Sequence, residues 1–200
     1  MIRIAGSLGL LDCRLMYTKY RFIHAIKRKV FSCLLGVCET ILDLIRGGVL
    51  YLLIMRHGDA LSAAMDFDRV LSPLGEQEAR KSALAIKAKE IGLDQILCSP
   101  LPRAIQTAEI VNTVSYPKID VEVWRDLAPG SQCGRVAQKL NVEQVGARLL
   151  VCHQPFASRM LQYLTATNLP IATGMVACVQ MDSINQHSGE LAWICSDLPV

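Results

Sequence analysis

The fold of this chain is decided by residues 50–58, which read LYLLIMRHG. A short apolar run that ends at a glycine turn is typical of a buried strand in a parallel sheet. In open α/β sheets the ligand binds in the crevice at the carboxyl ends of the strands. Arg56 and His57 therefore leave the sheet where ligands bind, and a guanidinium beside a neutral imidazole suits phosphoryl transfer through histidine. An Arg-His pair at a strand end is also compatible with a structural or solvated pair, so the other motifs have to decide.

Strands and helices alternate along the chain after this first strand. Ser72-Pro73 predicts the start of a helix, because serine caps helix N-termini and proline fits the first turn, and Gly92 predicts its end. The remaining predicted elements are strands over residues 94–98, 119–124 and 147–152, helices that start at Pro102 and Pro155, and an antiparallel hairpin over residues 175–194. This alternation predicts a three-layer α/β sandwich with a mostly parallel central sheet.

The composition is that of a folded protein with reduced thiols. The chain has 200 residues, of which 52% are hydrophobic and 20% charged, so we expect one main domain with a substantial core and exclude general disorder. Its eight cysteines form no Cys-x-x-Cys pair and show no metal-ligand spacing with the four histidines. We therefore expect free, mostly buried thiols, no metal site and a cytoplasmic location.

Residues 1–48 form a basic N-terminal extension. Residues 1–49 hold eight Lys and Arg against three acids, a net charge of +5, which leaves −2 for residues 50–200 out of the chain's total of +3. The core is therefore not predicted to bind nucleic acid. The extension has no stretch suited to span a bilayer and no cleavage site of a signal peptide. Two interpretations stay open: a peripheral amphipathic helix with weak membrane-surface contact, or a misassigned start of translation.

Three more polar residues follow other predicted strands. Arg103 lies in the first turn of the second predicted helix, where free N–H groups and the helix dipole favour an anion. His153 directly follows a predicted strand, and Asp126 lies in the loop after another. Each of these residues, taken alone, is compatible with a structural or surface role. Together with the Arg-His pair they lie at the same sheet edge, which predicts one pocket for a phosphoryl dianion.

These motifs resemble those of the histidine phosphatase superfamily, which has a phosphoglycerate mutase-like fold and an Arg-His-Gly motif after its first strand. Residues 99–108, SPLPRAIQTA, resemble the second motif of that superfamily, and residues 152–155, CHQP, resemble its third. The resemblance covers residues 50–198 and implies a histidine phosphatase domain over residues 49–200. Within the superfamily the chain most resembles the short SixA-type phosphohistidine phosphatases, because residues 54–60 read IMRHGDA and no large cap is inserted.

The resemblance also implies a role for each site residue. His57 would be the nucleophile and carry the phosphoryl group transiently. Arg56 and Arg103 would bind the phosphoryl oxygens, and His153 would bind and stabilise the transferred group. No metal and no cofactor is implied, because the side chains supply the charge. Larger relatives hold a glutamate as general acid where this chain holds Asp126, which is shorter by one methylene.

The predicted function is that of a metal-independent phosphatase that removes phosphate from phosphohistidine in signalling or phosphocarrier proteins. An imidazole leaving group needs less protonation than an alkoxide does, so a short or misplaced acid at Asp126 is tolerable for a P–N bond. The predicted partner is a histidine phosphotransfer or phosphocarrier domain, which an open pocket without a cap admits. Two alternatives stay open: a phosphatase of small phosphate esters or anhydrides, and a non-catalytic phosphate-binding module.

Overall fold

The computed structural model describes residues 49–142 and 146–195, which belong to one compact unit, Gly48–Val200. The predictions made for residues 1–48 lie outside the described residues. Among the residues that are described, no helix is both long enough and apolar enough to cross a lipid bilayer.

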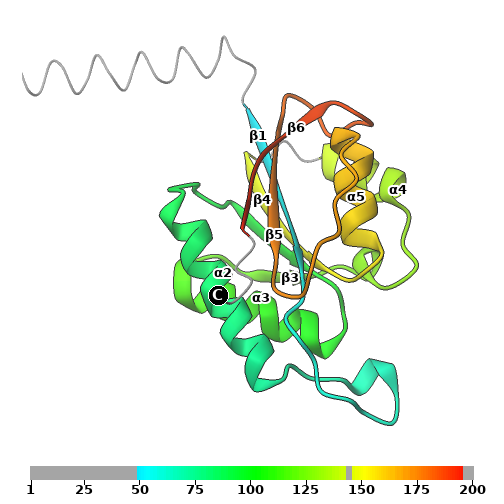
Figure 1. Cartoon of the computed structure of the whole chain (residues 1–200). Coiled ribbons are helices and arrows are strands. Elements are labelled where there is room, and N and C mark those ends of the chain that lie inside the picture. Colours follow the sequence, from blue (N-terminus) through cyan, green and yellow to red (C-terminus); the bar gives the residue numbers. More distant parts are fainter. Residues whose placement is uncertain (1–48, 143–145, 196–200) are drawn as a thin grey trace, which may run out of the picture. The chain divides into compact units, whose positions relative to one another are not determined.

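A mixed sheet of six strands lies at the centre of the described unit (Figure 1). The strands are β1 (Leu50–Arg56), β2 (Gln95–Cys98), β3 (Val121–Val123), β4 (Ala147–Cys152), β5 (Val176–Met181) and β6 (Gly189–Cys195). Their order is β3-β2-β4-β1-β5-β6, with parallel pairing among the first four and antiparallel pairing of β5 with β1 and β6. The carboxyl ends of the four parallel strands therefore meet at one edge of the sheet.

Helices cover both faces of this sheet (Figure 1). The described α-helices are α2 (Pro73–Ala88), α3 (Pro102–Ser115), α4 (Cys133–Val142) and α5 (Phe156–Thr165). One face packs against α2 and α3 and the other against α4 and α5. Two 3-10 helices, η1 (Asp66–Asp68) and η2 (Arg125–Leu127), lie in the loops after β1 and β3. The predicted three-layer α/β sandwich is confirmed. Among the described residues, no connection between two strands holds more than one α-helix and one 3-10 helix.

Alternating side chains of β1 contribute to both halves of the core. Leu52 and Ile54 pack in the cluster that contains α4 and α5, whereas Leu53 and Met55 pack in the cluster that contains α2 and α3. Successive side chains of a strand point to opposite faces, so a strand covered on both faces has to be apolar at every position. All four side chains are at most 1% exposed. This burial fixes the register of β1 and therefore the point at which Arg56 leaves the sheet.

The helix starts differ in how clearly the sequence marks them. Ser72 caps α2 as predicted: its Oγ accepts a hydrogen bond from Gly75 N at 3.1 Å, and proline fills the first turn. The sequence does not predict α4, because Gly130 and Gly134 at its start are typical of a loop. The structure forms this helix because its apolar face is buried, at Val136, Ala137 and Leu140.

Candidate active site

The carboxyl ends of β1, β2 and β4 lead into a pocket of about 280 Å³. The pocket brings together four of the five predicted site residues, namely Arg56, His57, Arg103 and His153. Its other lining residues are Asp59, Ala60, Asp66, Arg69, Pro129, Gln154 and Thr173. The fifth predicted residue, Asp126, does not line this pocket.

His57 is held at the end of β1 by its backbone and by its ring. The backbone N–H donates to Cys152 O at 3.0 Å, next to the last β1–β4 pair. In the ring, Nδ1 lies 2.7 Å from Gly58 O. A carbonyl oxygen only accepts, so Nδ1 carries the proton, and Nε2 of the neutral ring keeps its lone pair. That lone pair accepts a hydrogen bond from Arg103 Nε at 3.3 Å.

The two predicted arginines differ in their partners. Arg103, in the first turn of α3, is only 4% exposed. Its Nη1 donates to the backbone oxygen of Asp66 at 2.6 Å, and its Nη2 donates to Asp66 Oδ2 at 2.9 Å. Arg56 donates from Nη1 to Ile171 O at 3.4 Å, and its buried Nε has no partner among the described residues. These two guanidinium groups and that of Arg69 line one pocket, and the Asp66 carboxylate from η1 is paired with Arg103.

His153 lies beside His57 and is 2% exposed. The centroids of the two imidazole rings are 4.9 Å apart, and the rings are tilted by 56°. A hydrogen bond of 2.6 Å joins His153 Nε2 to Ser99 Oγ, while the buried Nδ1 has no partner within the described part of the chain. An unmet hydrogen bond of this kind is what a bound ligand can satisfy.

Burial keeps both imidazoles uncharged at neutral pH. It lowers the pKa of His57 to about 4, and the positive charges of Arg103 and Arg56 add to this shift. Burial, followed by the charge of the neighbouring His57, lowers the pKa of His153 to about 3. His57 Nε2 is therefore an unprotonated nitrogen, whose lone pair can attack phosphorus once it gives up the 3.3 Å hydrogen bond from Arg103 Nε.

Hydrogen bonds through the Thr107 side chain join the segment after His57 to the helix that carries Arg103. Gly58 N–H donates to Thr107 Oγ1 at 3.1 Å, and the Thr107 hydroxyl donates to Arg103 O at 2.7 Å. On the other side, Gly174 N–H donates to His57 O at 3.1 Å. One network therefore positions the imidazole and the guanidinium relative to each other, as a preorganised phosphoryl site requires.

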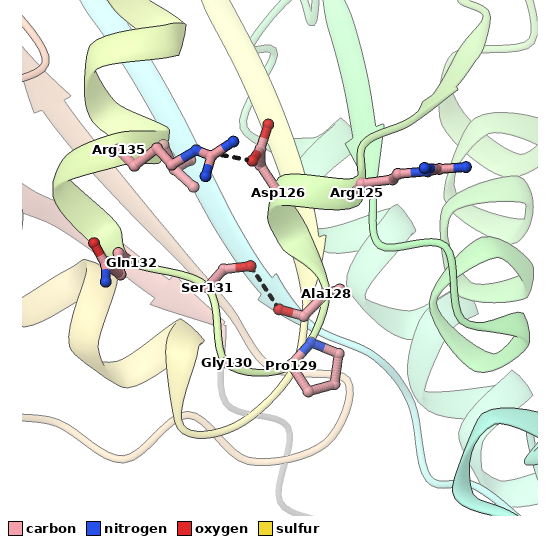
Figure 2. A pocket seen from close by; sticks show the side chains of 9 residues that line it. Arg125, Asp126, Ala128, Pro129, Gly130, Ser131, Gln132 and Arg135 are labelled. Carbon is pink, nitrogen blue, oxygen red and sulfur yellow. Dashed lines mark hydrogen bonds and ion pairs between the residues drawn. The ribbon is translucent and has the colours of Figure 1, made fainter.

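Asp126 belongs to a second hollow of about 400 Å³, which shares Pro129 with the active pocket. Figure 2 shows its carboxylate turned toward Arg135 of α4. Oδ1 lies 3.2 Å from Arg135 Nε, and Oδ2 accepts a hydrogen bond from Lys139 Nζ at 2.9 Å. The bond from Lys139 lowers the pKa of Asp126, so the carboxyl stays ionised and is poorly suited to donate a proton. The structure does not bring Asp126 together with the other four residues, because α4 supplies its ion-pair partners.

The loop between β1 and α2 supplies site residues that the sequence does not identify. Asp66 and Arg69 both line the pocket, and the Arg69 guanidinium donates to Leu61 O and Ala60 O, each at 2.9 Å. The loop has neither helical nor strand periodicity, so nothing in the sequence places these side chains. Ser99, which contacts His153, is the first residue of the second motif, and this position is the signal in the sequence that could have identified it. No three His, Cys, Asp or Glu side chains in the described residues are grouped so that they could hold a metal ion.

Three comparisons place this site in a known family. The family model "Histidine phosphatase superfamily (branch 1)" matches residues 52–144. The phosphohistidine phosphatase SixA of Escherichia coli (strain K12) is 33% identical over 146 residues, which are 70% of this chain and 89% of that protein. The solved structure of the protein histidine phosphatase SixA complexed with tungstate is 32% identical and matches 74% of this chain and 97% of that chain, with a TM-score of 0.67.

More distant structures share the fold alone. A mycobacterial glucosyl-3-phosphoglycerate phosphatase matches 74% of this chain and 99% of its own, with 17% identity and a TM-score of 0.55. The similarity to SixA is much closer, because a third of the aligned residues are identical over most of both chains. On this evidence the chain belongs to the histidine phosphatase superfamily and is a SixA homologue.

Proposed function

We propose that this chain is a phosphohistidine phosphatase, which takes the phosphoryl group from a histidine of a partner protein and passes it to water. The observation that carries the proposal is the state of His57. Its Nδ1 is bound to Gly58 O, its pKa is lowered to about 4, and its ring lies in a pocket lined by three arginines. The similarity to SixA, a phosphohistidine phosphatase, supports the same reaction.

In the first step His57 Nε2 attacks phosphorus. The substrate phosphohistidine reacts with its second ring nitrogen protonated. A P–N bond forms to His57 Nε2 as the P–N bond to the substrate breaks, and the substrate ring leaves as a neutral imidazole with the electron pair of the broken bond. His57 keeps its own proton on Nδ1, so the positive charge passes to the ring of phospho-His57. Arg56, Arg103 and His153 bind the phosphoryl oxygens, where hydrogen bonds from fixed donors stabilise the charge of the transition state. On Arg103 the phosphoryl group replaces the Asp66 carboxylate, because both anions use the Nη2 donor.

In the second step water attacks the phosphorus of phospho-His57. The P–N bond to the enzyme breaks, inorganic phosphate leaves, and the neutral imidazole is restored. The sum of both steps is phosphohistidine plus water to histidine plus phosphate. The positive charge that a metal ion supplies in other phosphoryl-transfer sites comes here from Arg56 and Arg103, so we propose that turnover is metal-independent.

The ionised state of two carboxyl groups, Asp66 in the pocket and Asp126 in the neighbouring hollow, favours a substrate with a P–N bond over one with a P–O bond. A sugar phosphate needs an acid to protonate its alkoxide, whereas an imidazole leaves more readily. The hydrogen bond from Arg103 lowers the pKa of Asp66, and ion pairs keep Asp126 ionised, so neither is suited to be that acid at neutral pH. We therefore propose as partner a histidine phosphotransfer or phosphocarrier domain of the cytoplasm.

A trapping experiment tests the mechanism. The full chain is mixed with a phosphocarrier domain that carries a ³²P-labelled phosphoryl group on its histidine. The reaction is quenched in alkali, and the label on the full chain is measured. We expect acid-labile, alkali-stable label on the wild type and none on His57→Asn, with turnover lowered at least about 10³-fold. The matched control is His187→Asn, the same change at an exposed histidine that does not line the pocket.

Three outcomes contradict the proposal in different ways. If His57→Asn keeps full turnover, the reaction does not pass through a phosphorylated His57. If the wild type releases phosphate faster from sugar phosphates than from the carrier domain, its substrates are small esters. Tight phosphate binding without any turnover by the wild type indicates a non-catalytic phosphate-binding module instead.

A further inference from the structure

Exposed apolar side chains are concentrated in the loop between β1 and α2. Eight large hydrophobic residues are exposed in the described part of the chain, and four of them lie within residues 61–70. Their exposed fractions are 47% for Leu61, 53% for Met65, 55% for Phe67 and 38% for Val70. Single exposed apolar residues are ordinary, but several together on a soluble protein mark an interaction site. We refer to these four side chains as the apolar rim.

The loop that carries the apolar rim is pinned at its base. Ala60 and Leu71 form an antiparallel bridge, and Leu61 N–H donates to Val70 O at 2.9 Å. Inside the loop, Arg69 donates to two carbonyl oxygens of the opposite side, and Leu71 N–H donates to Gln106 Oε1 of α3 at 2.8 Å. The backbone of the loop is therefore ordered before any partner arrives. A preorganised surface loses little conformational entropy on binding.

The tip of the same loop contacts Arg103, which is hydrogen-bonded to His57. Asp66 lies between Met65 and Phe67, and it accepts hydrogen bonds from both Nη groups of Arg103, whose Nε is bonded to His57. Two residues of the apolar rim thus flank a residue of the pocket wall in the sequence. A histidine side chain is short, so a protein that presents its phosphohistidine to His57 must bring its own surface against the rim of the pocket.

We propose that the apolar rim is the docking surface for the protein that carries the phosphohistidine, and that this protein has an apolar patch beside that histidine. The inference rests on the proposed function and adds the recognition chemistry of its partner. Apolar contact selects a folded protein over a free phosphorylated metabolite, because small polar phosphates have no surface that the rim can cover.

Comparison of two substrates tests the inference in the full chain. Met65→Ser together with Phe67→Ser removes the two most exposed side chains of the rim and leaves Asp66 in place. With a phosphorylated phosphocarrier domain as substrate, we expect KM to rise and kcat/KM to fall by at least about tenfold. With free phosphohistidine as substrate, kcat/KM stays within about twofold of wild type, which also confirms that the variant is folded.

The matched control is Leu84→Ser, because Leu84 is 57% exposed on α2 and does not line the pocket. We expect it to leave turnover of both substrates at the wild-type rate. If kcat/KM of the double variant falls equally with both substrates, or does not fall with the carrier domain, the apolar rim is not the docking surface. The proposed phosphatase activity of the wild type is unaffected by either result. Absence of turnover in the wild type instead overturns the proposed function itself.

Crosslinking identifies what covers the rim. A photoreactive phenylalanine at position 67 of the full chain is irradiated with the phosphocarrier domain, and the crosslinked peptides are sequenced. We expect crosslinks to residues next to the carrier's phosphorylated histidine. Crosslinks to residues 1–48 of the same chain, or to a second copy of it, would show a different occupant and overturn the inference.

Discussion

The reactivity of His57 depends on which of its nitrogens holds a proton. Burial and the nearby arginines lower its pKa to about 4, whereas an imidazole in water titrates near about 6.5. Gly58 O holds the remaining proton on Nδ1, so the protein also selects the nitrogen that reacts. The ring is then fully in its nucleophilic form at pH 7 without a separate base to deprotonate it.

Titration of His57 tests this state directly. Because the lowered pKa favours the neutral ring, we expect the ring ¹⁵N and ¹H NMR signals of His57 to stay constant from pH 8 down to about pH 5 and to shift only near pH 4. Comparison with His57→Asn assigns the signals. A titration midpoint near about 6.5 would contradict the buried, neutral imidazole.

The sequence predicts the position of a site residue where that residue is attached to a buried strand. His57 and His153 follow strands whose register is set by burial on both faces, and Arg103 follows β2 at the start of a helix. Asp126 lies beyond the short edge strand β3, where no buried register fixes its direction. Its carboxylate is oriented by ion pairs with α4, and such a tertiary contact has no local signal in the sequence.

At the scale of elements, the exit from β1 and the start of α2 cross in direct backbone contact. A Cβ atom on Gly58 would clash with Gly75 O and would lie 2.9 Å from Gly75 Cα. A Cβ atom on Gly75 would in turn clash with the backbone oxygen of Asp59. Both glycines are needed because the two segments approach more closely than any side chain allows. The glycine of the Arg-His-Gly motif therefore has a packing function beside its place next to the nucleophile.

Substitution of Gly58 should separate this contact from general effects of glycine. We expect Gly58→Ala to lower the free energy of unfolding by about 2–3 kcal/mol, because the added methyl group meets rigid backbone atoms. Gly92→Ala is the matched control: no atom lies within 4 Å of its Cβ position, so we expect a change within about 0.5 kcal/mol. Urea unfolding of both variants measures the difference, and equal stabilities would contradict the close contact.

Elements with local signals were easier to predict than elements without them. The apolar run of β1 and the cap at Ser72 each define an element by themselves. By contrast, α4 begins among glycines, and its helical state is stabilised by burial against the sheet and α5. The loop that holds η1 shows neither the helical nor the strand periodicity of apolar residues, and its tip is held by the contact of Asp66 with Arg103. Local sequence patterns do not predict tertiary contacts of this kind.

At the scale of the whole molecule, the parallel sheet gathers distant segments into one buried polar site. His57 and His153 are 7% and 2% exposed, so folding takes two imidazoles out of water. Their pKa values, about 4 and about 3, are lower than those of unfolded histidine. Between those values and about pH 6.5 the unfolded chain binds more protons than the folded chain does, so stability rises with pH in this window.

Acid should therefore destabilise the protein through these two rings. From pH 7 to pH 5 we expect the free energy of unfolding to fall by about 4 kcal/mol, since linkage with the unfolded pKa near about 6.5 gives about 2 kcal/mol for each ring over this range. In the double variant His57→Asn, His153→Asn most of this dependence should be lost. Urea titrations at the two pH values measure it, and an unchanged pH dependence in the double variant would exclude the two histidines as its source.

The pairing of Asp66 with Arg103 has a consequence for the end of each turnover. The carboxylate that leaves Arg103 when a phosphoryl group binds stays tethered close by, at a high effective concentration. Once phosphate is formed, Asp66 competes with it for the same guanidinium, and no counter-ion has to arrive from solution. In the proposed reaction, product release is thus an exchange of one anion for another, and Arg103 returns to its ion pair with Asp66.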